Sequence, residues 1–197
     1  DNQNLYIPYV KGNLALLQYK YDGNTGKVTA LEPKDAKPRH GTGPRHMAYH
    51  PKLPMVYFSN EQGIGLSTYR RDKDGQLKVE QDIAILPPGM SKIGLSASDL
   101  HITPDGKFLF AGLRGHKQDF DRIARYKVLE NGHAKLLGLT KADKVPWGLA
   151  LSPDGKYLLV SATTGATLSA YHITQDGDLN RVATLDWEPR MSDLVTR

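Results

Sequence analysis

The sequence of 197 residues contains no cysteine. This absence excludes disulfides, thiolate zinc sites, iron–sulfur clusters and a cysteine nucleophile. It does not select a compartment, because a protein without disulfides is viable on either side of a membrane. Cytoplasm and periplasm both remain open for a soluble protein of this composition.

Long apolar runs and blocks of like charge are also missing. No stretch reaches the ~18 consecutive apolar residues of a membrane-spanning helix, so no membrane span is expected. Lys and Arg number 26 against 21 Asp and Glu, a net charge of +5 spread along the chain. There is no basic stripe with interleaved aromatic residues, so nucleic acid is not an expected partner. The small excess favours an anionic small molecule at one focused site.

A sequence repeat is the strongest signal that is present. Thr103–Ala111 (TPDGKFLFA) matches Ser152–Val160 (SPDGKYLLV), and His50–Phe58 (HPKLPMVYF) is a weaker third copy. The prolines of the three copies are spaced by about 50 residues, which is typical of the blades of a β-propeller.

Each copy predicts four strands joined by tight turns. In the best-defined copy the strands are Asp99–Ile102, Lys107–Gly112, Ile123–Val128 and Ala134–Leu137. A Pro-Asp-Gly turn joins the first two, since its proline presets φ and its glycine accepts a positive φ. Helical periodicity is absent, so each copy predicts one four-stranded antiparallel sheet.

The fold predicted is all-β, a single β-propeller segment spanning 1–197. We expect a partial blade over 1–37, then blades over 38–97, 98–143 and 144–197. These are about four blades of a larger ring; the alternative is a closed four-bladed ring, against which the missing first strand of the partial blade argues. The partial blade lacks its first strand, and an open arc would leave two apolar sheet faces in water. We therefore expect this chain to be part of something longer, with another polypeptide segment completing the propeller ring.

Three motifs in consecutive blades carry a resemblance to a known family. They are Gly43–His46 (GPRH), Ser59–Glu61 (SNE) and Leu113–His116 (LRGH). In this order they resemble the lactonase family of seven-bladed propellers, which includes bacterial 6-phosphogluconolactonases and fungal carboxy-muconate cyclases. The resemblance runs from about Asn4 to the end and implies the C-terminal half of such a ring, or slightly more. It implies no metal and no organic cofactor.

The chain departs from the family pattern at three places. Leu113 stands where the family usually has Asn before Arg-Gly-His. The last blade opens Pro146-Trp147-Gly148 in place of Pro-Arg-Gly, and Ser161–Thr163 replaces a stretch that usually carries an Asn-Gln pair. We expect these positions near the central channel, where they bear on the substrate more than on the fold.

The motifs predict a catalytic group consisting of Glu61, Arg45 and His46. Lactone hydrolysis requires a base to activate water and a positive group to stabilise the developing oxyanion. Glu61, at the end of a second strand, is the expected general acid/base. The alternatives remain open: Glu61 and Arg45 as a structural ion pair, and His46 as a hydrogen-bonded packing residue.

We expect Arg114, His116 and Asn60 to bind the substrate. A guanidinium group binds planar oxyanions in a bidentate manner, which suits a small anionic lactone or carboxylate. The alternative for Arg114 is a solvated turn residue. Asp99 and His101 lie two apart on a predicted strand and share a face, where packing between blades is the expected role.

The activity predicted is hydrolysis of a sugar lactone or phospholactone, as in 6-phosphogluconolactonases. Two other interpretations remain open, a muconate-type lactonizing cyclase and a non-catalytic propeller that serves as a binding scaffold. A propeller fold hosts many unrelated functions and does not by itself decide among them.

Overall fold

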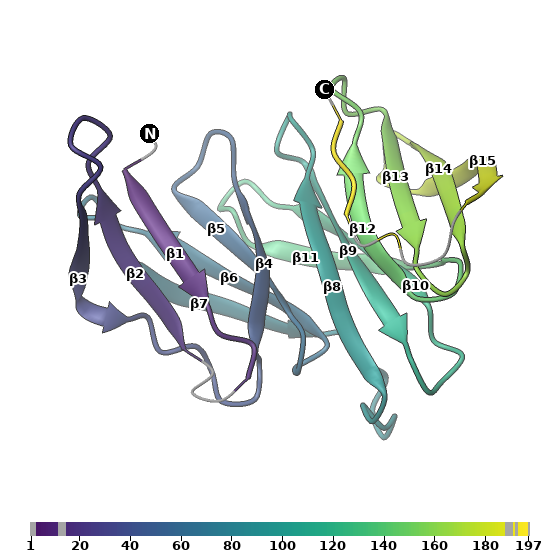
Figure 1. Ribbon diagram of the computed structural model, residues 1–197, viewed down its shortest axis with the longest axis horizontal. Helices are drawn as coiled ribbons and strands as arrows, with labels where there is room; N and C mark the ends of the chain where they lie inside the picture. The colour runs from purple at the N-terminus through teal and green to yellow at the C-terminus, as the bar shows by residue number, and fades with distance from the viewer. Residues whose placement is uncertain (1–2, 12–14, 188–190, 192, 197) are drawn as a thin grey trace.

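The computed structural model describes residues 3–11, 15–187, 191 and 193–196. Every regular element in these ranges is a β-strand, and the strands form four antiparallel sheets in chain order (Figure 1). No helix of the length and apolarity needed to cross a membrane occurs among these residues.

The first sheet has three strands, and each of the other three sheets has four. Consecutive strands pair throughout, so each sheet is an up-and-down meander. The first sheet consists of β1 (Asn4–Pro8), β2 (Leu16–Tyr21) and β3 (Val28–Asp35). The second contains β4 (Pro44–Tyr49), β5 (Met55–Asn60), β6 (Gly65–Arg71) and β7 (Leu77–Ala84).

The third and fourth sheets repeat this pattern. The third contains β8 (Leu95–Ile102), β9 (Phe108–Gly115), β10 (Arg122–Val128) and β11 (Ala134–Lys141). The fourth contains β12 (Pro146–Leu151), β13 (Tyr157–Ala162), β14 (Thr167–Ile173) and β15 (Leu179–Asp186).

Two sequence-based boundaries differ from the structure. β8 begins at Leu95, so the expected blade boundary between residues 97 and 98 falls inside a strand. The reason is that Leu95 and Ser96 pair with Gly115 and Arg114 of β9, beyond a register shift in β8. The fourth strands are also longer than predicted: β11 continues past Leu137 because it pairs along the whole of β10. These outer strands carry mixed polar residues, so apolar alternation does not reveal their full length.

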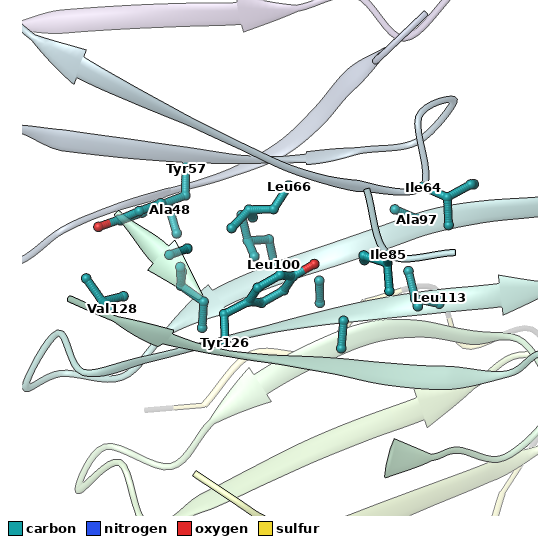
Figure 2. Packing of buried hydrophobic residues seen from close by; sticks show 14 of the residues in the cluster. Ala48, Tyr57, Ile64, Leu66, Ile85, Ala97, Leu100, Leu113, Tyr126 and Val128 are labelled. Atoms are coloured by element: carbon teal, nitrogen blue, oxygen red, sulfur yellow. The ribbon is translucent and has the colours of Figure 1, made fainter. Parts of the chain in front are cut away.

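Neighbouring sheets pack face to face through apolar side chains. Between the second and third sheets, this core includes the large side chains of Tyr57, Leu66, Leu100 and Tyr126 (Figure 2). The Tyr57 hydroxyl donates a hydrogen bond of 2.8 Å to the Gly132 carbonyl in the next sheet. A comparable core joins the first two sheets and another joins the last two. Each sheet is thus held by its neighbours rather than by a core of its own.

The first strands of the three complete sheets share an irregularity that matters for the site. β4, β8 and β12 are neighbours in space (Figure 1). Their pairing shifts register between Pro44 and Met47, between Ala97 and Leu100, and between Pro146 and Gly148. A β-bulge re-aims the side chains of the residues it contains. Arg45, Asp99 and Trp147 are bulge residues of this kind.

Candidate active site

The carboxylate of Glu61 lies between two guanidinium groups from different sheets. Glu61 directly follows β5, and its backbone N–H donates to the Gly43 carbonyl at 2.8 Å. Its Oε2 atom accepts a hydrogen bond of 2.7 Å from Nη1 of Arg45, on β4. The same oxygen lies 3.5 Å from Nη2 of Arg114, on β9. The structure therefore brings together three of the residues that the sequence selected.

Arg114 is the most deeply buried charge of this group, with a side chain that is 3% exposed. Its Nη2 atom donates to the Ala97 carbonyl at 2.9 Å, which fixes the guanidinium plane. The pKa of Arg114 is lowered to about 10, chiefly by burial; the negative charge of Glu61 opposes this shift and the positive charge of Arg45 adds to it. The group is still protonated at neutral pH, so it presents a desolvated positive charge beside Glu61. Such charges interact more strongly than exposed ones.

His116 lies at the edge of the site. Its Nε2 atom is 3.1 Å from the Ser96 hydroxyl, and the ring meets the Trp147 ring edge to face, with centroids 6.4 Å apart. Partial burial, and then the positive charge of Arg114, lower the pKa of His116. A neutral imidazole next to an arginine can accept a hydrogen bond from a substrate hydroxyl.

Trp147 belongs to the site although sequence reasoning did not select it as a site residue. Its ring centroid lies 4.2 Å from the guanidinium carbon of Arg114 and 5.8 Å from that of Arg45. Its position in the repeat could have indicated this, because Trp147 follows a proline at the start of a blade, as Arg45 does.

His46 and Asn60 have partners other than Glu61. Nδ1 of His46 lies 2.9 Å from Oδ1 of Asp99. The Asn60 side chain is buried within the second sheet, where its amide donates to the Ser67 hydroxyl at 2.7 Å. Asn60 is thus held inside the second sheet and His46 contacts Asp99, while catalysis by His46 and substrate binding by Asn60 stay predictions.

Asp99 joins all three bulged strands. Its carboxylate contacts His46 of β4 and His101 of its own strand β8, at 2.9 and 3.2 Å. It also accepts hydrogen bonds from the backbone N–H groups of Leu100 and of Leu149 on β12, at 2.8 and 2.9 Å. Burial alone would raise the pKa of Asp99, but the bonds from His101, His46 and Leu149 outweigh it and hold the pKa below its usual range. Asp99 therefore stabilises the alignment of the inner strands as a carboxylate.

Replacing Asp99 with Ala should lower the free energy of unfolding by about 2–6 kcal/mol, because two buried N–H groups lose their acceptor and each costs ~1–3 kcal/mol. Asp99→Asn keeps one acceptor and should cost less. Because the folded-state pKa is depressed, the stabilising charge is complete at neutral pH and disappears as the pH falls through the acid range. Urea unfolding at neutral pH and at about pH 3 measures both effects. An Asp99→Asn variant with the same pH dependence as the parent would contradict this assignment.

The described residues contain no cluster of three or more His, Asp or Glu side chains arranged to hold a metal ion. The chemistry that the site offers is that of a carboxylate and two guanidinium groups. The carboxylate can take a proton from water and return it, and the guanidinium groups can stabilise negative charge on an oxygen atom.

The model of a family described as lactonase, seven-bladed β-propeller, matches residues 10–188. The chain belongs to this lactonase family. The 6-phosphogluconolactonase of Klebsiella pneumoniae subsp. pneumoniae is 30% identical over 185 residues, which cover 91% of this chain and 53% of that protein. The 6-phosphogluconolactonase of Erwinia tasmaniensis is 30% identical over 180 residues, covering 91% and 52%.

A solved structure with the same fold is the periplasmic gluconolactonase PpgL of Pseudomonas aeruginosa. It superimposes with a TM-score of 0.85 at 22% identity, over 97% of this chain and 53% of PpgL. The chain spans about half the length of each of these proteins. The predicted resemblance and the all-β propeller fold are thereby confirmed, and the four sheets are blades of a lactonase propeller.

Proposed function

We propose that the protein hydrolyses a sugar lactone of the 6-phosphogluconolactonase type, with Glu61 as general acid/base. The observation that carries the proposal is the placement of Arg45 and Arg114 at 2.7 and 3.5 Å from one oxygen of Glu61. The names of the two relatives that share 30% identity support the same reaction class.

The reaction needs two groups, and this site holds both. Glu61 takes a proton from a water molecule, whose oxygen attacks the lactone carbonyl carbon. The carbonyl oxygen becomes an oxyanion, which Arg114 stabilises in its desolvated position. When the tetrahedral intermediate collapses, the ring C–O bond breaks and Glu61 returns the proton to the leaving ring oxygen. The product is an open-chain hydroxy acid, so atoms and charges balance.

Arg45 orients Glu61 through their 2.7 Å hydrogen bond. Both Arg45 and Arg114 carry guanidinium groups that can bind an anionic group of the substrate. The two arginines therefore favour an anionic substrate over a neutral one.

The test is an assay of pH change on the purified native assembly, corrected for the spontaneous reaction: lactone hydrolysis releases a proton, and lactonization of a muconate takes one up. Gluconolactone, 6-phosphogluconolactone and a carboxymuconate serve as substrates. We expect turnover of at least one of the two lactones. Turnover of the muconate alone would support the cyclase interpretation, and no turnover of any substrate would support the non-catalytic scaffold; either result overturns the proposal.

The second part of the proposal concerns the ring, which we propose is completed by another polypeptide segment with the same blade architecture. The first and last sheets lie at opposite ends of the molecule (Figure 1). Their outer surfaces carry exposed apolar side chains: Leu5 and Ile7 on β1, Val182 and Leu185 on β15. Val182 and Leu185 are 56% and 52% exposed. In a propeller such faces pack against the next blade.

Mass spectrometry under denaturing and native conditions tests this completion. We expect the native particle to exceed the 21.8 kDa of this chain. The additional mass would come either from a second polypeptide or from further blades in the same polypeptide. The denaturing measurement distinguishes these two sources, because it gives the mass of each polypeptide separately. A native particle of one 21.8 kDa chain would refute ring completion.

A further inference from the structure

Trp147 occupies in the last blade the position that Arg45 occupies two blades earlier. The backbone N–H of His46 lies 3.2 Å from the Ser59 hydroxyl, and that of Gly148 lies 3.1 Å from the Ser161 hydroxyl. These matching hydrogen bonds align the two bulges residue by residue. The residues just before them, Arg45 and Trp147, are therefore equivalent, and the same bulge that aims Arg45 at Glu61 aims Trp147 at the same site.

The Trp147 ring is positioned by contacts with two arginines and one histidine. One contact is the guanidinium group of Arg114, whose carbon is 4.2 Å from the ring centroid, within the range of a cation–π interaction. Arg45 lies 5.8 Å from the ring and His116 meets it edge to face. Trp147 is only partly buried, so part of the residue remains accessible to solvent next to Arg45 and Arg114. A rigid aromatic surface that is partly exposed suits contact with a ligand.

We infer that Trp147 is a specificity-determining residue whose indole stacks against the ring of the substrate lactone. A sugar lactone presents a face of C–H groups, which the electron-rich face of an aromatic ring attracts, and its hydroxyl groups point outward to polar partners. Glu61 and Arg114 then act on the carbonyl at the ring edge. This inference rests on the proposed lactone hydrolysis and adds the residue that recognises the ring of the lactone and disfavours the open-chain product.

Enzyme kinetics on the native assembly provide one test. Trp147→Ala should raise KM for gluconolactone about tenfold, with a smaller change in kcat, because a stacking contact is present in both the ground state and the transition state. Trp147→Phe keeps an aromatic face and should restore most of the affinity. A purely structural role for Trp147 predicts instead that both variants lower kcat or stability while KM is unchanged.

Tryptophan fluorescence provides a test that does not depend on turnover. The chain has two tryptophans, and Trp187 is 52% exposed near the end of β15. In a Trp187→Phe background, titration with gluconolactam, a non-hydrolysable ring analogue, should change the emission of Trp147. The open-chain product gluconate should change it much less.

The results separate this inference from the function on which it rests. If the parent hydrolyses gluconolactone while gluconolactam leaves Trp147 emission unchanged, or Trp147→Ala leaves KM unchanged, only the stacking role is refuted. If the parent hydrolyses no lactone, the proposed function fails and the inference fails with it. An equal response to gluconate and to gluconolactam would overturn the assignment of a cyclic ligand.

Discussion

Replacing Glu61 with Gln is expected to lower kcat for lactone hydrolysis by roughly 10²–10⁴-fold, the usual contribution of a general acid/base. Glutamine has nearly the same shape and can still accept a hydrogen bond from Arg45, but it cannot take a proton from water. The fold should therefore persist, as measured by thermal unfolding. Proton-release assays of both proteins measure the loss of turnover.

The same substitution should strengthen the binding of an anionic ligand. Glu61→Gln leaves the positive charges of Arg45 and Arg114 without their carboxylate partner, so a carboxylate product no longer competes with Glu61. Its inhibition constant should fall while kcat collapses. Tighter product binding together with a lower kcat distinguishes loss of the acid/base from general damage to the site, which would weaken both binding and turnover.

A matched control is available on β7. Glu80 also pairs with an arginine, since its Oε1 atom lies 2.5 Å from Nε of Arg70, and its Oε2 atom lies 3.1 Å from Nε2 of His133. Glu80→Gln should leave turnover unchanged, because this pair lies outside the group around Glu61. A Glu61→Gln protein that keeps more than about half of the parent activity would remove Glu61 from the mechanism, given the size of the effect expected of an acid/base.

Replacing Arg114 with Met is expected to lower kcat by about 10²–10³-fold, the usual cost of losing one donor to an oxyanion. Methionine fills much of the volume of the arginine stem but carries no charge. The variant also leaves the Ala97 carbonyl without its 2.9 Å donor, so a loss of stability of about 1–3 kcal/mol should accompany the loss of activity. Steady-state kinetics and urea unfolding measure the two effects separately.

Arg125 supplies the comparison for Arg114→Met. It is another little-exposed arginine of the same blade, and it donates to the Gly177 carbonyl and pairs with Asp178 in the next blade. Arg125→Met should reduce stability without a specific loss of kcat in the folded protein. Equal losses of kcat in the two variants would show that Arg114 acts only by holding the blades together.

Much of the fold could be predicted from the sequence because a blade is built from local features. The Pro-Asp-Gly turns and the alternating strands act over about ten residues, so three repeats near Pro51, Pro104 and Pro153 were enough to indicate the sheets. The ends of the outer strands could not be predicted in this way. β11 is paired to its full length by β10 rather than by its own apolar pattern.

In the candidate site, too, some residues could be predicted from the sequence and others could not. Arg45, Glu61 and Arg114 stand in three motifs, and the structure brings them together. Packing between blades was the expected role of Asp99, but the partners of Asp99 and of Trp147 required the tertiary structure, because Leu149 lies 50 residues from Asp99 and Arg114 lies on a strand of the preceding blade from Trp147. No local pattern shows that Asp99 accepts the Leu149 N–H or that Trp147 covers Arg114.

The repeating sheets and the residue types available for chemistry could thus be derived from the amino-acid order, since both follow from short-range backbone preferences and side-chain identity. Which side chains meet depends on how the blades pack. Bulges in β4 and β12 turn Arg45 and Trp147 of two separate blades toward Arg114, and Asp99 in the β8 bulge ties the three strands together. The meeting of Glu61, Arg114 and Trp147 is therefore a property of adjacent blades and not of any single repeat.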